Sequence, residues 1–311
     1  VYTITLQPDG KIFAGGQFSI FNGSGVNGIV RLNTNGSIDA TFNIGTGANG
    51  AVNASALQPD GKLIIGGVFV SYNGTTVNRI TRLNTNGSID ATFNSGTGAN
   101  SGVYEITTQS DGKILVGGLF TTYNGAASVR IMRLDTSGNI DPTFITGIGA
   151  TNTVSSFAFQ SDGKIIVGGY LTSYNNVSRP YCMRLDTNGV LDRSFNIATG
   201  VTGVVCSISL QPDGKIIMGG LFEAYNNRYL YRVARANIDG SADTTFNIGS
   251  GANNTVYATA LQSDGKIIIG GSFTTFNGVP KNCLARLNSD GSIDPTFITG
   301  TGPNLAVKDI A

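Results

Sequence analysis

The chain has 311 residues and a net charge of +1; 13% of its residues are charged and 44 are glycine. Without a basic stripe nucleic acid is not an expected partner, and no apolar run approaches the roughly 18–20 residues that insert into a bilayer. The chain has no histidine, so the commonest general base and metal ligand is absent.

A repeat of 51 residues organises the chain. Its Asp-Gly-Lys triplet starts at Asp9, Asp60, Asp111, Asp162, Asp213 and Asp264. Fixed-period self-similarity indicates a repeat architecture and overrides the domain count that length alone suggests. We therefore expect a single repeat domain, 1–311, with copies at 1–51, 52–102, 103–153, 154–204, 205–255 and 256–306, and a further copy starting at 307–311. The chain lacks an initiator methionine, so we interpret it as a segment of a longer protein.

The first half of each repeat predicts a β-hairpin. In the first copy, Val1–Gln7 is β-prone, Pro8-Asp9-Gly10 predicts a type I turn closed by a bulge, and Lys11–Phe18 forms the second strand. The second strand is almost continuously apolar in the other copies, which suits a strand buried on both faces. Its glycine pair, Gly15 and Gly16, predicts the close approach of another backbone.

The second half predicts another hairpin, with strands at Gly28–Asn33 and Ser37–Asn43 and a turn at Thr34-Asn35-Gly36. Residues that face each other across an antiparallel hairpin point the same way, and only a three-residue turn gathers the apolar side chains of both strands on one face. The same register sets Arg31 directly opposite Asp39.

This charge pair recurs in every copy. The pairs are Arg31 and Asp39, Arg82 and Asp90, Arg133 and Asp141, Arg184 and Asp192, Arg235 and Asp243, and Arg286 and Asp294. We expect a buried or half-buried pair that ties the third strand to the fourth, so that removing one partner costs about 3–5 kcal/mol. A ligand site repeated six times is the alternative.

Four short antiparallel strands at this period are typical of a propeller blade. The predicted fold is all-β, a β-propeller of six four-stranded blades. Residues 1–5 and 307–311 occupy the same phase of the repeat, so seven or more blades, or an open β-repeat array, are alternatives.

The repeat also resembles a known family. The unit Leu-Gln-Pro-Asp-Gly-Lys-Ile-Ile-x-Gly-Gly-x-Phe, followed by Tyr-Asn-Gly, Arg-Leu-Asn and Gly-Ser-Ile-Asp-x-Thr-Phe, is similar to the delta-60 repeat family of bacterial propeller-like repeats. The resemblance covers essentially the whole chain. It implies a secreted or surface-displayed bacterial protein, and it carries no general enzymatic activity or catalytic residue.

Catalysis and metal binding find little support in the sequence. No constellation of a nucleophile and a base is present, so we expect no enzyme and no cofactor. The three cysteines, Cys182, Cys206 and Cys283, fall at different phases of the repeat and predict small buried side chains rather than disulfides or metal ligands. Weak calcium candidates stand in the third copy, where Asp135, Ser137 and Asp141 have part of a calcium-loop spacing.

Binding by loops is the remaining class, because loops on a rigid scaffold carry function. The loop opened by Phe21-Asn22-Gly23 varies most between copies, and in the fifth copy it is rich in tyrosine and arginine, which are enriched in interface hot spots. The binding candidates are Tyr225, Arg228, Tyr229, Tyr231 and Arg232.

These observations predict a non-enzymatic extracellular module of a bacterial surface protein that serves as an adhesin or as a structural or interaction scaffold. The alternative is a lectin-like propeller with repeated glycan sites. The expected partners are a protein or glycan at the blade loops, and other domains of the same surface protein.

Overall fold

The computed structural model describes residues 1–311, which form strands, turns and loops. The chain divides into two compact units, Val1–Gly149 and Ala150–Ile310, with three repeats in each. It contains no helix that could cross a membrane.

Each repeat of the first unit contains a three-stranded antiparallel sheet and a separate two-stranded hairpin. In the first repeat the sheet order is β1-β2-β5, and β3 and β4 form the hairpin. The strands of this unit are β1 (Thr3–Leu6), β2 (Ile12–Gly15), β3 (Ile20–Phe21), β4 (Ser24–Gly25), β5 (Ile29–Leu32), β6 (Val52–Leu57), β7 (Leu63–Gly67), β8 (Ser71–Tyr72), β9 (Thr75–Thr76), β10 (Ile80–Leu83), β11 (Val103–Thr108), β12 (Ile114–Gly118), β13 (Thr122–Tyr123), β14 (Ala126–Ala127) and β15 (Ile131–Leu134).

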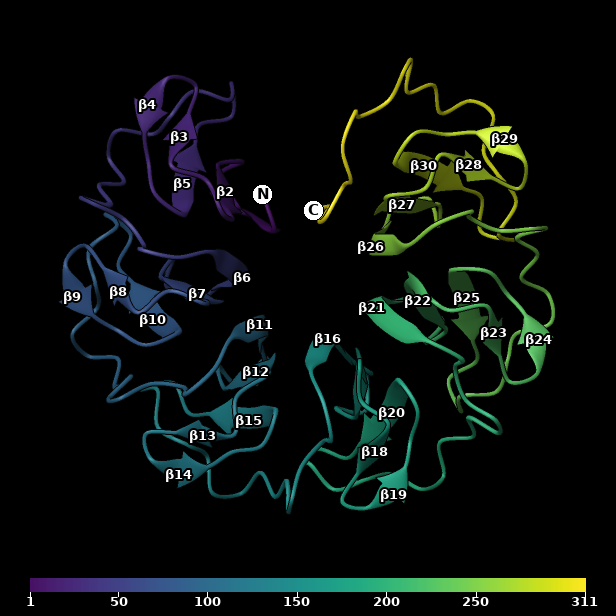
Figure 1. Cartoon of the computed structure of the whole chain (residues 1–311), viewed down its shortest axis with the longest axis horizontal. Helices are drawn as coiled ribbons and strands as arrows, with labels where there is room; N and C mark the ends of the chain where they lie inside the picture. The colour runs from purple at the N-terminus through teal and green to yellow at the C-terminus, as the bar shows by residue number, and fades with distance from the viewer. The chain divides into compact units, whose positions relative to one another are not determined.

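The second unit repeats this pattern, with sheet orders β16-β17-β20, β21-β22-β25 and β26-β27-β30. Its strands are β16 (Val154–Phe159), β17 (Ile165–Gly169), β18 (Ser173–Tyr174), β19 (Val177–Ser178), β20 (Cys182–Leu185), β21 (Val204–Leu210), β22 (Ile216–Leu221), β23 (Ala224–Tyr225), β24 (Arg228–Tyr229), β25 (Val233–Ala236), β26 (Val256–Leu261), β27 (Ile267–Gly271), β28 (Thr275–Phe276), β29 (Val279–Pro280) and β30 (Leu284–Leu287). In each unit the first strands of neighbouring repeats contact one another, and the small hairpins lie on the opposite side of the unit (Figure 1).

The first turn forms as predicted. The amide of Gln7 donates to the carbonyl of Lys11 at 2.8 Å, and the amide of Gly10 donates back to the carbonyl of Gln7 at 2.9 Å. Gly10 has a φ of 82°, which closes the three-residue loop in the left-handed region. The turn Pro8-Asp9-Gly10 is therefore confirmed.

The prediction of a fourth strand over Ser37–Asn43 is wrong, although the predicted register is right. Leu32 pairs with Ile38 as predicted, but this is an isolated bridge. The pairing stops because the Asp39 carboxylate accepts hydrogen bonds from the backbone amide of Thr41 at 3.0 Å and from its hydroxyl at 2.7 Å. Such local bonds between a side chain and the backbone compete with a ladder, so the chain turns away after one pair.

The segment expected as a loop after Phe21 is itself a hairpin, formed by β3 and β4. Phe21 pairs with Ser24, and the two residues between them have positive φ, 47° at Asn22 and 80° at Gly23. This is the two-residue turn that Asn-Gly favours, because both residues tolerate the left-handed region.

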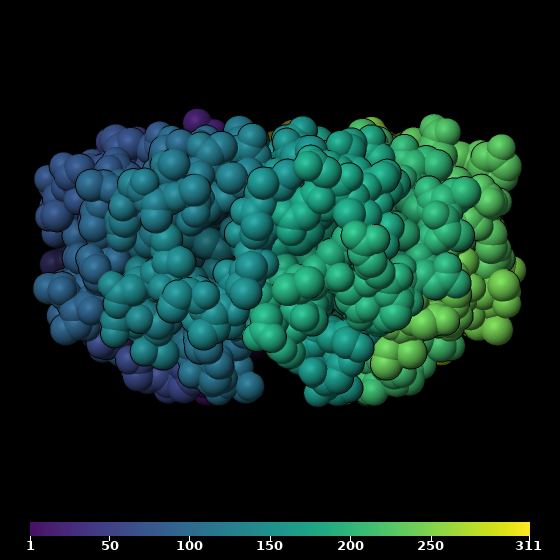
Figure 2. Space-filling model, turned by 90° about the horizontal axis from the view of Figure 1, so that it is seen from below, coloured from purple at the N-terminus to yellow at the C-terminus, as the bar shows by residue number.

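Neighbouring repeats pack through the glycine pair of β7. A Cβ atom on Gly66 would clash with Val103 and Ile106 of the next repeat, and one on Gly67 would clash with the carbonyl oxygen of Ala51. The predicted approach of another backbone is thus confirmed at the second glycine, while side chains approach the first. In the space-filling view, the teal-to-green repeats of the second unit pack without an intervening gap (Figure 2).

Candidate functional site

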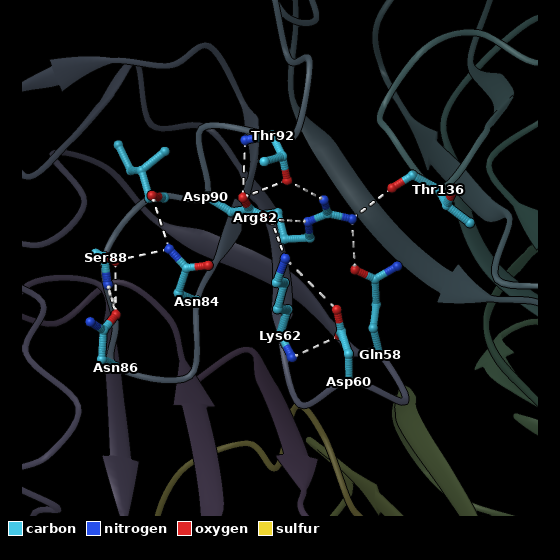
Figure 3. Close-up of polar contacts among 11 residues, drawn as sticks. Gln58, Asp60, Lys62, Arg82, Asn84, Asn86, Ser88, Asp90, Thr92 and Thr136 are labelled. Atoms are coloured by element: carbon cyan, nitrogen blue, oxygen red, sulfur yellow. Dashed lines mark hydrogen bonds and ion pairs between the residues drawn. The ribbon is translucent and has the colours of Figure 1, made fainter.

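Each repeat has a polar cluster centred on its arginine, and Figure 3 shows the cluster of the second repeat. The Nε atom of Arg82 donates to Oδ2 of Asp90 at 2.7 Å. Its Nη1 donates to the side chain of Gln58 at 3.1 Å and to the carbonyl of Thr136, in the next repeat, at 2.6 Å. The cluster therefore joins three segments of one repeat to a turn of its neighbour.

The lysine of the Asp-Gly-Lys triplet completes the cluster. Lys62 Nζ lies 2.9 Å from Oδ2 of Asp90, and the amide and hydroxyl of Thr92 donate to Oδ1 at 3.0 and 2.7 Å. Burial alone would raise the pKa of Asp90. The hydrogen bonds from Thr92, Lys62 and Arg82 outweigh that effect and hold the pKa well below its ordinary range. The carboxylate is therefore ionised, and both of its oxygens already accept hydrogen bonds.

All six copies share the ion pair of this cluster. The distance from arginine Nε to aspartate Oδ2 is 2.7–2.9 Å in every repeat. Each guanidinium also lies over the ring of a phenylalanine of its own repeat, within 4.6–5.0 Å of the ring centroid. The alternative was a ligand site repeated six times. The aspartate oxygens that such a site would use already accept bonds from within the protein, so the arrangement is that of an internal link.

Sequence reasoning missed two members of this cluster. The glutamine that receives Arg82 Nη1 recurs at the same phase in each copy, as Gln7, Gln58, Gln109, Gln160, Gln211 and Gln262. Its constancy was a readable signal. The carbonyl acceptor in the next repeat carries no signal, because any residue provides a carbonyl: Thr136 accepts from Arg82, and Ile238 accepts from Arg184 at 2.7 Å.

The calcium candidates of the third repeat have other partners. Oδ1 of Asp135 accepts hydrogen bonds from the amides of Ser137 at 2.8 Å and Asn139 at 2.9 Å. Oδ2 of Asp141 lies 2.8 Å from Arg133 Nε and 3.1 Å from Lys113 Nζ. The structure has no group of three or more carboxylate, thiol or imidazole side chains placed to hold a metal ion. The residues form a turn and an internal ion pair instead.

Two of the five binding candidates in the fifth repeat are structural. Tyr225 is fully buried, and its hydroxyl donates to the carbonyl of Gly240, as Tyr174 does to Gly189 one repeat earlier. Arg232 has a φ of 70° and donates to the carbonyl of Phe222 at 2.7 Å. Both residues therefore belong to the internal packing of the blade.

The other three candidates lie on β24 or just after it. Tyr229 is 76% exposed. Its ring stacks on that of Tyr231, with centroids 6.2 Å apart and planes inclined by 16°. Nη1 of Arg228 donates to the carbonyl of Asp243 at 2.9 Å. We call these residues, Arg228, Tyr229 and Tyr231, the tyrosine patch.

The cysteines form no disulfide. Cys182 and Cys283 are buried, as predicted for small apolar side chains, whereas Cys206 is only partly buried.

The repeats match a family model described as "Domain of unknown function (DUF5122) beta-propeller", over residues 7–42, 58–93, 109–144, 160–195, 211–246 and 262–297. The chain belongs to this family. The first match begins at Gln7 and ends at Phe42, so each matched segment contains both turns and the Arg–Asp pair of one repeat. The expectation of a β-propeller repeat family is therefore confirmed. A comparison with curated proteins finds no match.

Solved propeller structures resemble the chain in fold. The WD40 β-propeller domain of Doa1 has a TM-score of 0.60 at 14% identity, covering 97% of this chain and 82% of that one. PorZ, a surface component of the type-IX secretion system of Porphyromonas gingivalis, has a TM-score of 0.59 at 14% identity, covering 95% and 41%. A catalytically inactive virginiamycin B lyase from Staphylococcus aureus, solved with quinupristin, has a TM-score of 0.56 at 19% identity, covering 94% and 82%. At these identities the likeness concerns the fold alone.

Proposed function

We propose that this chain is a non-enzymatic propeller module of an extracellular bacterial surface protein and that it binds a protein partner through the tyrosine patch. The observation that carries the proposal is the stack of the exposed Tyr229 on Tyr231. Tyrosine and arginine are enriched in the hot spots of protein interfaces, and tyrosine presents a large contact area with little side-chain entropy to lose.

The charged residues support a scaffold role. The six paired aspartates, five of them buried, and their arginines are engaged in internal links, and the lysines of the Asp-Gly-Lys triplets pair with those aspartates. General acid–base catalysis requires a titratable group within reach of substrate, with a pKa near the working pH. Aspartates whose pKa values lie well below the ordinary range, as at Asp90 and Asp141, do not suit that role.

A protein partner is favoured over repeated glycan sites. A lectin with one site in each blade needs the same exposed residues in each repeat. The position of Tyr229 is instead occupied in the other copies by Gly25, Thr76, Ala127, Ser178 and Pro280. The patch is therefore a feature of one repeat, as in a single protein interface.

The extracellular location and the blade number are further parts of the proposal. Two structural neighbours support the location: PorZ, described as a bacterial surface component, and an extracellular domain of a two-component system protein from B. thetaiotaomicron, with a TM-score of 0.53 at 16% identity. We assign one blade to each copy of the repeat, which makes six. Rotational symmetry in electron-microscopy class averages tests that number.

The test compares the double variant Tyr229→Ala/Tyr231→Ala with Ser178→Ala, which alters the same position in the fourth repeat. Immobilised chains are incubated with bacterial and host surface extracts, and the bound proteins are quantified by mass spectrometry. We expect at least one protein whose recovery falls about tenfold or more with the double variant and stays unchanged with Ser178→Ala. Equal recovery with both variants would contradict the proposal. Binding to a glycan array that the double variant abolishes would instead support the lectin-like alternative.

A further inference from the structure

The second unit has another surface at which one residue position varies between repeats while its neighbours in the repeat stay constant. Each repeat has a constant valine at or near the start of its first strand, and in this unit Val205 and Val256 pack against Gly168 and Gly219 of the preceding repeats. Val307 packs against Gly270 in the same way. The residue after the valine varies, and in this unit it is Ser155, Cys206, Tyr257 or Lys308.

The backbone turns the variable residue out of the sheet. Val205 pairs with Gly220 and Ser207 pairs with Gly219, so Cys206 is an extra residue in the strand. Tyr257 is the extra residue between Val256 and Ala258. A β-bulge of this kind leaves its residue outside the ladder and redirects the side chain, and bulges are common beside functional sites.

Cys206, Tyr257 and Lys308 form a cluster with two exposed neighbours. Nζ of Lys308 lies 3.2 Å from the centroid of the Tyr257 ring. Tyr170 is 50% exposed and Leu221 is 47% exposed, and Leu221 pairs with Val204 just before the bulge. Burial raises the pKa of the Cys206 thiol to about 11, and the nearby charge of Lys308 acts in the opposite direction. Burial also raises the pKa of Tyr170, as do Cys206 and Tyr257 beside it.

Lys308 lacks the acidic partner that the repeat lysines have. Lysines such as Lys215 and Lys266 pair with Asp243 and Asp294 at 3.0 and 2.9 Å, whereas Lys308 forms no ion pair. Its ammonium therefore has no ionic partner and lies over the partly exposed ring of Tyr257. A carboxylate brought to this surface by a partner would meet the opposite charge directly.

We infer that this rim, comprising Tyr170, Cys206, Leu221, Tyr257 and Lys308, binds a peptide segment of a partner protein that carries an aliphatic or aromatic side chain beside a carboxylate. The apolar side chain packs on Tyr170, Leu221 and Tyr257, and the carboxylate pairs with Lys308. Cys206 and Tyr257 of the rim lie on the first strands β21 and β26, whereas the hairpin of β23 and β24, which bears Tyr229, is on the opposite side of that unit (Figure 1). It is therefore a separate site.

The composition of the rim favours a peptide over a glycan. Sugar recognition depends on several convergent hydrogen-bonding groups, and the rim has few. The hydroxyl of Ser155 already donates to the carbonyl of Val205 at 3.2 Å. An apolar contact around one uncompensated charge suits a short hydrophobic and acidic segment.

The experiment selects binders from a display library of random peptides about 12 residues long, with the whole chain as the target. Selected peptides are synthesised with a tryptophan and titrated by fluorescence, since the chain itself contains no tryptophan. We expect the selected peptides to place Asp or Glu next to an apolar residue. We expect Lys308→Gln and Tyr257→Ser each to weaken binding at least tenfold, and bound peptide to slow alkylation of Cys206.

Two controls separate this site from loss of fold and from the tyrosine patch. Asn53→Ala changes the bulge residue of a repeat in the first unit, and Tyr229→Ala/Tyr231→Ala removes the patch; neither should alter peptide affinity. The melting temperatures of all variants are measured alongside. The inference is overturned if no peptide is enriched, if the peptides bind the Lys308→Gln and Tyr257→Ser variants with unchanged affinity, or if only oligosaccharides bind the rim.

Discussion

Neutralising the buried aspartate of one repeat should destabilise the protein far more than removing the lysine that it also contacts. Arg82 and Asp90 are 6% and 4% exposed. Asp90→Asn leaves the guanidinium of Arg82 buried without its counter-charge, which costs about 3–5 kcal/mol. The Lys62 side chain is 28% exposed, so water screens its charge. Lys62→Met should therefore cost no more than about 1 kcal/mol.

Comparing the same arginine substitution in two repeats measures how much the hydrogen bond to the neighbouring repeat contributes to stability. Arg82 donates to the carbonyl of Thr136, whereas Arg286 bonds to Asp294, Gln262 and Thr296 and to no carbonyl of another repeat. The Arg286 side chain is also more exposed. Arg82→Met should therefore cost more than Arg286→Met, by about 1.5–3 kcal/mol, the value of a hydrogen bond from a charged group.

Urea denaturation at neutral pH measures each free energy of unfolding, with circular dichroism as the probe. The double variant Arg82→Met/Asp90→Asn removes both charges of the pair and should cost less than the sum of the two single changes, because the arginine charge is no longer left buried alone. Two results would refute the reasoning. One is a cost for Asp90→Asn no larger than that for Lys62→Met, and the other is strict additivity in the double variant.

Four other predictions follow from the same geometry. As the pH falls, Asp192 should be the first of the six paired aspartates to be protonated. Burial raises its pKa, but hydrogen bonds from Ser194 and Arg184 bring the pKa down to about 2. The pKa values of the other five paired aspartates are lower still. This stabilisation is complete above the unfolded aspartate pKa of about 3.9 and is lost as pH falls toward 2, which a carboxyl NMR titration follows. Gly67→Ala should lower the free energy of unfolding by about 1–3 kcal/mol or more, because the added methyl group overpacks the site, and should lower the melting temperature accordingly. Gly25 has open space around it, so Gly25→Ala should leave the melting temperature unchanged. Burial raises the pKa of phenols such as Tyr72, so stability should fall as pH rises above about 10, where the unfolded phenol ionises; a melt at alkaline pH checks this. A calcium chelator should leave the melting temperature unchanged, because the oxygens of Asp135 and Asp141 already have partners.

The turns and the register of the fold were readable from the sequence because each has a local cause. Gly10 closes the first turn through its positive φ, and the apolar pattern aligned Leu32 with Ile38. The end of that pairing was not readable. It depends on the Asp39 side chain bonding to Thr41 rather than leaving the backbone to continue the ladder. The small hairpin was missed even though the signal was present, since Asn-Gly between two β-prone residues is the strongest short hairpin signature.

The candidate site shows a similar division. Tyr225 was grouped with exposed residues because of its neighbours, yet its own position is tyrosine or phenylalanine in every copy, as Phe21, Tyr72, Tyr123, Tyr174 and Phe276 are. An aromatic residue kept at one phase predicts a place in the core. Its burial and its bond to Gly240 follow from that constancy. The stacking of Tyr229 on Tyr231 needed the structure, because it depends on the side-chain directions on a short hairpin.

The repeats act as an internal comparison that separates packing from recognition. A residue present in all six copies meets the same neighbours six times, so the shared environment explains its presence, as for the arginines and the glycine pairs. A residue found in one copy has no such explanation from the repeated fold. Tyr229 and Lys308 are of this second kind, whereas tyrosine also stands at the phase of Tyr257 in the first and third copies, as Tyr2 and Tyr104. Tyr229 is exposed, so its substitution costs the blade little. Recognition can therefore change at these positions while the cluster around Arg82 keeps the repeats joined.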